Sequence, residues 1–157
     1  MIDIEDAYKQ YAKYVYKFIF VNVRGNKVIT DDLSSEVFLQ ALKSKHTYKE
    51  DLASVKTWLI GISRNVLKKY YGSYRPSVDL AEIEDTLTSG NDPEVNQLII
   101  LFLNKLTKEE RDLIVLKYMY DFSILDICKL TKLSESNCKV KIHRSMLKLK
   151  KLMNVKQ

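Results

Sequence analysis

The residues best suited to molecular recognition lie at positions 123–144, near the C-terminus. A helix is predicted on each side of a short turn, and Ser134 is a favourable N-cap for the second helix. Cys138 and Ile142 lie four residues apart and would share the buried face of that helix, while the apolar Leu133 would anchor the turn. This arrangement is typical of a helix-turn-helix, whose second helix enters the major groove of DNA.

The opposite face of this second helix carries polar and cationic side chains. Hydroxyl, amide and cationic groups can bond base edges and phosphates, and an aliphatic group can contact a thymine methyl. Positions 139–151 hold six Lys or Arg and no acidic residue, which favours DNA contact over a merely solvated lysine-rich helix. Lys132 occupies a turn position where Gly is common, at some conformational cost. The predicted DNA-binding residues are Ser136, Asn137, Lys139, Val140, Lys141, His143 and Arg144.

A second group of polar and aromatic residues follows the polar loop at positions 44–54. Unpaired bases need flat stacking partners, and their phosphates need cations. Tyr48 is expected to line a base pocket, whereas Trp58 is expected to pack in the core, since large aromatics at helical spacing usually point inward. The predicted residues for contact with separated strands are Tyr48, Lys49, Lys56, Arg64, Asn65, Lys68 and Lys69.

A third group combines acids with apolar residues on one predicted helix, a combination suited to docking on another protein. Phe38 and Leu39 point about 100° apart on a helix, so at least one is expected to belong to the core and the two are not expected to be buried together. The predicted docking residues are Asp32, Glu36, Phe38, Leu39 and Gln40.

The chain that must position these groups is predicted to be all-α, because it has only four Gly and two Pro and lacks strand-and-turn patterns. Apolar spacing predicts N-terminal helices over residues 4–20, 30–44 and 52–71, with Asp31 and Asp32 in the first turn of the second.

Helix is expected to restart at Asp92-Pro93, with three further starts after Thr107, Ser123 and Ser134. The expected buried stripe after Pro93 consists of Leu98, Ile99, Leu101, Phe102 and Leu106.

Charge divides the chain into three parts. Residues 1–73 have a balance of +4, residues 74–96 of −5 and residues 97–157 of +7. Two basic surfaces joined by an acidic segment suggest a polyanionic partner, although a generally basic protein would show the same composition. The predicted domains are 1–73 and 93–157, with an acidic linker at 74–92.

Two stretches of the sequence resemble bacterial sigma factors. The segment from Leu106 through Arg144 resembles region four, and Asp31-Asp-Leu-Ser-Ser-Glu-Val-Phe-Leu-Gln-Ala-Leu with Val55-Lys-Thr-Trp-Leu-Ile-Gly-Ile-Ser-Arg-Asn-Val-Leu resembles region two. A chain this short with both regions resembles the extracytoplasmic-function group. The resemblance implies a three-helix region-two-like domain and a four-helix region-four-like domain with a helix-turn-helix.

The same resemblance implies partners and roles. Core RNA polymerase would hold the docking residues against its beta-prime clamp helices and the C-terminal domain against its beta flap. The helix-turn-helix would bind the upstream promoter element, and Asn65 would lie beside an extruded base of the downstream element. An anti-sigma protein would be a further partner. The acidic linker could approach the polymerase active site or serve only as a spacer.

Other functions find little support in the sequence. The chain has no phosphate-binding Gly-rich motif and no nucleophile elbow, so neither an enzyme nor a cofactor is expected. Cys128 and Cys138 lie ten residues apart without a CxxC or His pair, which argues against a metal site and makes a redox switch improbable. No signal peptide or membrane span is predicted, so a cytoplasmic protein is expected.

Two alternatives to a sigma factor stay open. One is a helix-turn-helix regulator that binds duplex DNA without polymerase. The other is a sigma-like adaptor that binds polymerase without melting promoters.

Overall fold

A computed structural model of the chain describes residues 2–73 and 97–155. These residues are almost entirely helical and contain no strand, which confirms the predicted all-α class. The chain divides into two compact units, Met1–Asp92 and Pro93–Gln157. The predicted linker at 74–92 lies outside the described residues.

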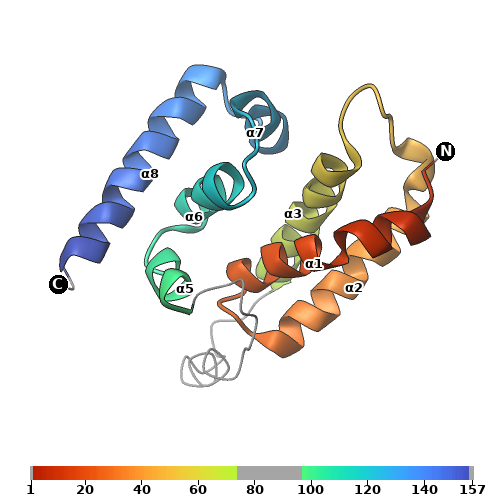
Figure 1. Ribbon diagram of the computed structural model, residues 1–157, viewed down its shortest axis with the longest axis horizontal. Coiled ribbons are helices and arrows are strands. Elements are labelled where there is room, and N and C mark those ends of the chain that lie inside the picture. The colour runs from red at the N-terminus through yellow and green to blue at the C-terminus, as the bar shows by residue number, and fades with distance from the viewer. Residues whose placement is uncertain (1, 74–96, 156–157) are drawn as a thin grey trace. The chain divides into compact units, whose positions relative to one another are not determined.

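Over residues 2–73, the first unit is a three-helix bundle in which each helix packs against the other two (Figure 1). Its elements are α1 (Ile4–Asn22), α2 (Lys27–Lys43), the 3-10 helix η1 (Lys45–Thr47) and α3 (Val55–Ser73). The bundle core includes Val15 and Phe18 of α1, Val37 of α2, and Leu59 and Ile60 of α3, all fully buried. Burial of these apolar side chains is the main stabilising contribution to the unit.

The second helix begins one turn earlier than its apolar pattern predicts. Asn26 is the N-cap, and its side-chain oxygen accepts a hydrogen bond from the backbone N–H of Ile29 at 3.1 Å. The prediction that Asp31 and Asp32 lie in the first turn is therefore wrong, because both lie in the second turn. Asn26 follows Gly25 between two apolar runs, a position where Asn also suits a turn, so its capping role is not evident from the sequence.

The start of α3 is set in the same way. The hydroxyl of Ser54 accepts a hydrogen bond from the backbone N–H of Thr57 at 3.1 Å, so the helix begins at Val55, not at Leu52. Near the other end of α3, the Tyr71 hydroxyl donates to the backbone carbonyl of Asn22. The Tyr71 contact joins the end of α3 to the end of α1.

Within residues 97–155, the second unit contains four α-helices and one π-helical turn. Its elements are α5 (Gln97–Leu103), α6 (Lys108–Ile114), the π-helix η2 (Val115–Met119), α7 (Ile124–Thr131) and α8 (Glu135–Val155). Helices α5, α6 and α7 all pack against α8, so the long helix organises the unit. No signal in the sequence analysis pointed to the π-helix.

The buried side of α5 differs from the predicted stripe. Phe102 and Leu106 are buried as expected, but Leu98, Ile99 and Leu101 are exposed. The short helix is apolar on all sides, so its sequence does not indicate which side packs.

A capping box starts α6, as the sequence predicts. The Thr107 hydroxyl accepts from the backbone N–H of Glu110 at 3.2 Å, and the Glu110 carboxylate accepts from the backbone N–H of Thr107 at 2.8 Å. The same carboxylate lies 2.9 Å from the Lys148 ammonium of α8. Burial alone would raise the pKa of Glu110, but the hydrogen bonds from Thr107 and Lys148 outweigh it and lower the pKa.

The turn between α7 and α8 has the strain expected at Lys132. This residue adopts a left-handed conformation with φ 63°, and its N–H donates to the Cys128 carbonyl at 2.7 Å. A side chain at such a φ carries a steric cost that glycine lacks.

Replacing Lys132 with Gly is expected to stabilise the second unit by about 0.5–1 kcal/mol, because glycine removes the left-handed cost while losing more backbone entropy. Urea titration followed by NMR at α7 and α8 amides would measure the change. Lys132→Gln is the matched control, since it removes the charge and keeps the backbone cost. Equal stabilisation by both variants would assign the effect to charge instead.

The Glu110→Gln variant should reveal a pH-dependent ion pair while retaining the capping box, which accepts Gln. Since folding lowers the pKa of Glu110, its contribution is complete above the ordinary carboxyl pKa and is lost as the pH falls through the folded value. The wild type is expected to be more stable by about 0.5 kcal/mol at about pH 7, and the difference should shrink as the pH falls below the ordinary carboxyl range. NMR-detected urea titrations of α6 and α8 across this range would contradict the assignment if the difference stayed constant.

Candidate nucleic-acid interface

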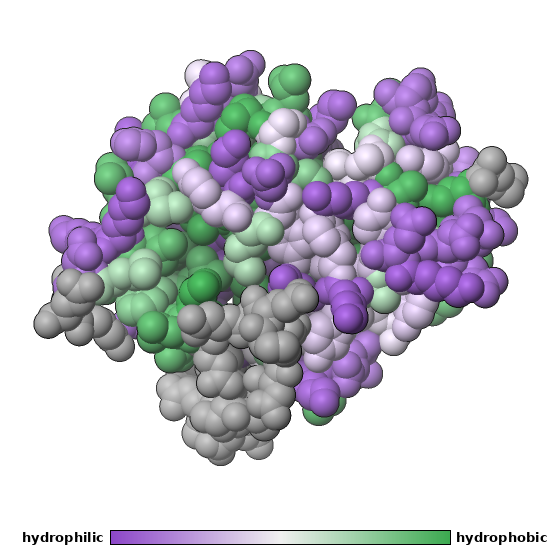
Figure 2. All heavy atoms as spheres, viewed as in Figure 1, coloured by the Kyte–Doolittle hydropathy of each residue, from purple (hydrophilic) through white to green (hydrophobic). Residues whose placement is uncertain are grey.

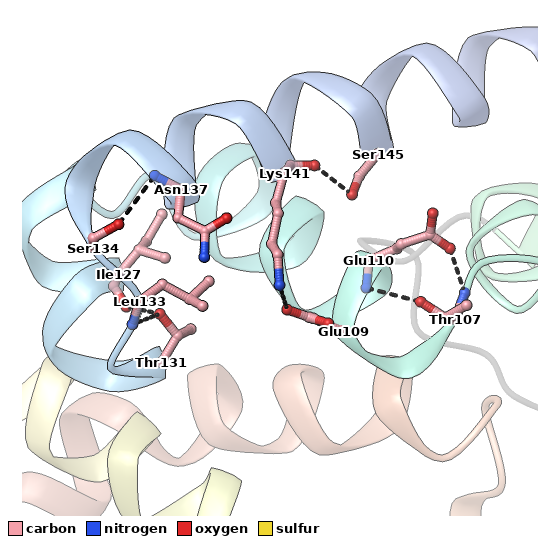
Figure 3. Close-up of polar contacts among 10 residues, drawn as sticks. All are labelled: Thr107, Glu109, Glu110, Ile127, Thr131, Leu133, Ser134, Asn137, Lys141 and Ser145. Atoms are coloured by element: carbon pink, nitrogen blue, oxygen red, sulfur yellow. Dashed lines mark hydrogen bonds and ion pairs between the residues drawn. The ribbon is translucent and has the colours of Figure 1, made fainter.

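The turn that precedes α8 is held by a small set of local hydrogen bonds (Figure 3). The Thr131 hydroxyl donates to the Ile127 carbonyl at 2.7 Å and accepts from the Leu133 N–H at 3.4 Å. The Ser134 hydroxyl accepts from the Asn137 N–H at 3.2 Å, which confirms Ser134 as the N-cap. These bonds fix the point at which α8 starts and hence the direction of its first turns.

One side of α8 is buried against the rest of the unit. Cys138 is fully buried, Ile142 and Ser145 are almost fully buried, and their spacing of four and three residues follows one helical stripe. Ile127 of α7, also fully buried, forms part of the same core. The predicted apolar pair in a helix-turn-helix is therefore confirmed.

The other side of α8 is open to solvent. Six of the seven predicted DNA-binding residues are exposed there: Ser136, Asn137, Lys139, Val140, His143 and Arg144. Val140 is 45% exposed, and Leu147, two turns later on the same side, is 53% exposed. Along the edge of Figure 2 where α8 lies in Figure 1, hydrophilic and apolar side chains alternate.

Leu147 is a residue that the sequence analysis did not select. Its position seven residues after Val140 would have placed it on the outward face. An exposed aliphatic residue on a cationic helix face offers contact with sugars or a base methyl group.

Lys141 differs from the other predicted DNA-binding residues. Its ammonium lies 2.6 Å from the carboxylate of Glu109 on α6, and its side chain points toward α6 in Figure 3. Lys148 is paired with Glu110 in the same unit, and Lys139 lies 3.1 Å from Glu135 of its own helix. The cationic stretch is therefore partly neutralised, because Glu135, Glu109 and Glu110 each pair with one of its lysines.

The two cysteines lie together between α7 and α8 and show no sign of reactivity. Cys138 is buried and Cys128 is partly exposed. Burial raises the pKa of the Cys138 thiol, and the adjacent Cys128 raises it further, so little thiolate forms. Among the described residues, no group of three or more His, Cys, Asp or Glu could hold a metal ion.

Only some of the residues predicted to contact separated DNA strands lie together in the structure. Asn65, Lys68 and Lys69 share an exposed side of α3 at spacings of three and four residues. Lys56, nine residues before Asn65, lies about half a turn away around the helix, and its ammonium lies 4.8 Å from the centre of the Tyr14 ring on α1. The structure thus separates Lys56 from the other α3 residues.

Tyr48 is fixed at the base of the loop before α3. Its hydroxyl donates to the Ala53 carbonyl at 3.0 Å, and its ring lies 5.1 Å from that of Trp58. Burial, followed by the nearby Glu50 and Tyr11, raises the pKa of Tyr48, so its hydroxyl stays protonated. Trp58 is only half-buried, which leaves part of this aromatic pair accessible. Lys49 is exposed in the same loop, and Arg64 is half-buried on α3.

The third group forms an outward face on α2. Leu39 is 45% exposed, and the Gln40 amide donates to the Glu36 carboxylate at 2.8 Å, while Asp32 is exposed one turn earlier. Phe38 points elsewhere and packs edge-on against Tyr8 of α1 at 4.9 Å. Phe38 and Leu39 are not both buried, as expected, but the expectation that at least one belongs to the core is wrong, because Phe38 is only half-buried at the edge of the bundle.

No helix in the parts of the chain that are described is both long enough and apolar enough to cross a membrane.

Two segments of the chain match related families. Residues 5–76 match Sigma-70 region 2, and residues 96–149 match Sigma-70 region 4. The first match covers the three-helix bundle and the second covers the helix-turn-helix, and together they span most of the chain.

One relative is similar in sequence, and two solved structures are similar in fold. The chain is 29% identical over 161 residues to the ECF RNA polymerase sigma factor SigX of Bacillus subtilis (strain 168), covering 94% of this chain and 82% of SigX. The structure of CnrH in complex with the cytosolic domain of CnrY has a TM-score of 0.72 at 18% identity, covering 98% of this chain and 89% of the other. The sigma factor RpoE in complex with the anti-sigma factor NepR from Bartonella quintana also has a TM-score of 0.72, at 16% identity and 98% coverage of both chains. The chain therefore belongs to the sigma-70 family, in its extracytoplasmic-function group, and is a sigma factor that directs RNA polymerase to promoters.

Proposed function

We propose a division of labour in which α8 binds the upstream promoter element, α3 and its preceding loop bind the melted downstream element, and α2 binds core RNA polymerase. The observation that carries this proposal is α8 itself. One of its faces is buried on Cys138 and Ile142, while the opposite face presents polar, cationic and aliphatic side chains to solvent. A helix exposed in this way fits the major groove.

Within α8, the types of side chain suggest separate roles. The side-chain amide of Asn137 suits an adenine edge, and the aliphatic Val140 suits a thymine methyl. Lys139 and Arg144 supply charge for phosphates, and Lys139 can exchange its exposed partner Glu135 for a phosphate at little cost. Arg144 has no carboxylate partner among the described residues.

Promoter melting is assigned to the exposed side of α3. Asn65 would hold an extruded base through its amide, with Lys68 and Lys69 on the phosphates. The pair of Tyr48 and Trp58 would wall the base pocket, because their rings are fixed against each other and remain partly accessible. Lys49 and Arg64 would add charge around this site, whereas Lys56 would contribute to bundle packing.

Docking on polymerase is assigned to the outward face of α2. Asp32, Glu36, Leu39 and Gln40 would contact the beta-prime clamp helices, and the second unit would contact the beta flap. The bond between Gln40 and Glu36 holds two of these side chains in place before binding. Phe38 would support this face from the side by packing on Tyr8.

The remaining assignments follow from these sites. Residues 1–73 would form the polymerase-binding and melting domain, residues 74–92 the acidic linker and residues 93–157 the upstream-element domain. The protein would have no catalysis of its own and would act in the cytoplasm, where polymerase works, without membrane attachment. An anti-sigma protein is a proposed partner, since CnrH is found with CnrY and RpoE with NepR.

The deciding experiment is run-off transcription with purified core polymerase on fragments of the host genome, with and without the protein. Discrete transcripts that require the protein would support the proposal. Specific duplex binding by the protein alone, with no transcripts, would favour the regulator. Transcription only from pre-melted templates would favour the adaptor without melting activity.

The double variant Lys139→Ala with Arg144→Ala should lower transcription at promoters that depend on the upstream element by about tenfold, because two phosphate contacts are lost and each neutralised phosphate adds to affinity. Core polymerase binding should be unchanged. The control is Lys9→Ala with Lys13→Ala, which removes the same charge from exposed positions on α1. Loss of polymerase binding in the α8 variant would contradict the division of labour.

Charge reversal by Glu36→Lys should weaken binding to core polymerase by about tenfold, equivalent to about 1.4 kcal/mol, because it breaks the bond with Gln40 and inverts the docking face. Competition for core polymerase against a labelled wild-type protein would measure this. Glu5→Lys makes the same reversal on α1 and should have no effect. An unchanged affinity would remove Glu36 from the docking surface.

A further inference from the structure

Two carboxylates at the start of α6 hold two lysines of α8. Glu109 lies 2.6 Å from the Lys141 ammonium, and Glu110 lies 2.9 Å from that of Lys148. Lys141 and Lys148 are seven residues apart, so they lie two turns apart on nearly the same side of the helix. The first turn of α6 therefore forms ion pairs with α8 at two positions, two helical turns apart.

The Glu110 pair is held more firmly than an ordinary surface ion pair, whereas the Glu109 side chain is 58% exposed and its partner Lys141 is 37% exposed. Glu110 is fixed by the capping box as well as by Lys148, and only 25% of its side chain is exposed. Glu109 lies in the first turn of α6, where a carboxylate is also favoured by the helix dipole. Both acids are thus positioned by α6 itself.

The remaining cations of α8 are not paired with a carboxylate of another helix in the described part of the chain. Arg144, Lys150 and Lys151 have no carboxylate partner within residues 2–73 and 97–155, and Lys139 pairs only locally with Glu135. The helix therefore carries six cations, of which two are engaged by another helix.

We propose that Glu109 and Glu110 are positioning residues that orient α8 and keep Lys141 and Lys148 from DNA phosphates. This inference rests on the proposed function of α8. Each phosphate that a lysine neutralises adds to the affinity for any duplex. When fewer lysines are available to phosphates, the sequence-independent affinity is therefore weaker. Base contacts by the outward face then account for a larger share of binding, so discrimination between promoters improves.

The test uses holoenzyme made from core polymerase and the full chain, bound to a promoter fragment and to the same fragment with a scrambled upstream element. In Glu109→Gln, Lys141 becomes available, so affinity for the scrambled fragment should rise about fivefold at about 0.1 M salt. The log–log salt slope should steepen by about 0.9, and the preference for the intact element should fall. Glu5→Gln is the control, since it removes a lysine-paired carboxylate from α1.

A second pair of variants compares Lys141, which is paired with Glu109, with Lys150, which has no carboxylate partner among the described residues. Lys141→Gln should leave the salt slope nearly unchanged, whereas Lys150→Gln should reduce it by about 0.9. Equal reductions would show that Lys141 already contacts phosphate and would overturn the inference. An unchanged slope in Glu109→Gln would also overturn it. If the wild-type holoenzyme instead made no specific transcripts, the proposed function itself would fail along with the inference.

Discussion

The left-handed turn at Lys132 fixes where α8 begins, and the recognition surface of the second unit depends on it. The N–H of Lys132 closes α7 on Cys128, and Ser134 then caps α8 two residues later. With the end of α7 and the start of α8 fixed, Cys138 and Ile142 are buried in the core that also contains Ile127. Only then do Asn137, Val140 and Arg144 face solvent, because a helix that buries one stripe must expose the opposite one. Conformational strain at one residue thus supports a surface of several turns.

The cationic side chains of α8 fall into two groups that its buried stripe does not indicate. The buried stripe of α8 runs from Cys138 to Ser145, but the cations of the helix fall into a set held by α6 and a set directed to solvent. Ion pairs of this kind contribute little to stability when exposed, so their effect on orientation and on available charge matters more than their energy. The first unit uses a comparable arrangement, in which Gln40 holds Glu36 on the outward face of α2.

The sequence was a good guide to helices and a weaker guide to their ends and partners. Capping signals at Thr107, Ser123 and Ser134 were recognised, because their bonds are local. The cap at Asn26 was missed because its residue type also suits a turn. The buried side of α5 was misjudged, since a helix that is apolar all round packs on whichever side its neighbours provide.

The all-α class, the helix-turn-helix and the types of side chain available for base and phosphate contact followed from the sequence, because residue type and helical spacing are local properties. The tertiary structure decided which of these side chains act together. It placed Lys141 on Glu109, Lys56 on the Tyr14 ring and Phe38 on Tyr8, each across a gap in sequence that periodicity does not bridge. Such pairings depend on how helices pack, and packing is set by the whole core of each unit.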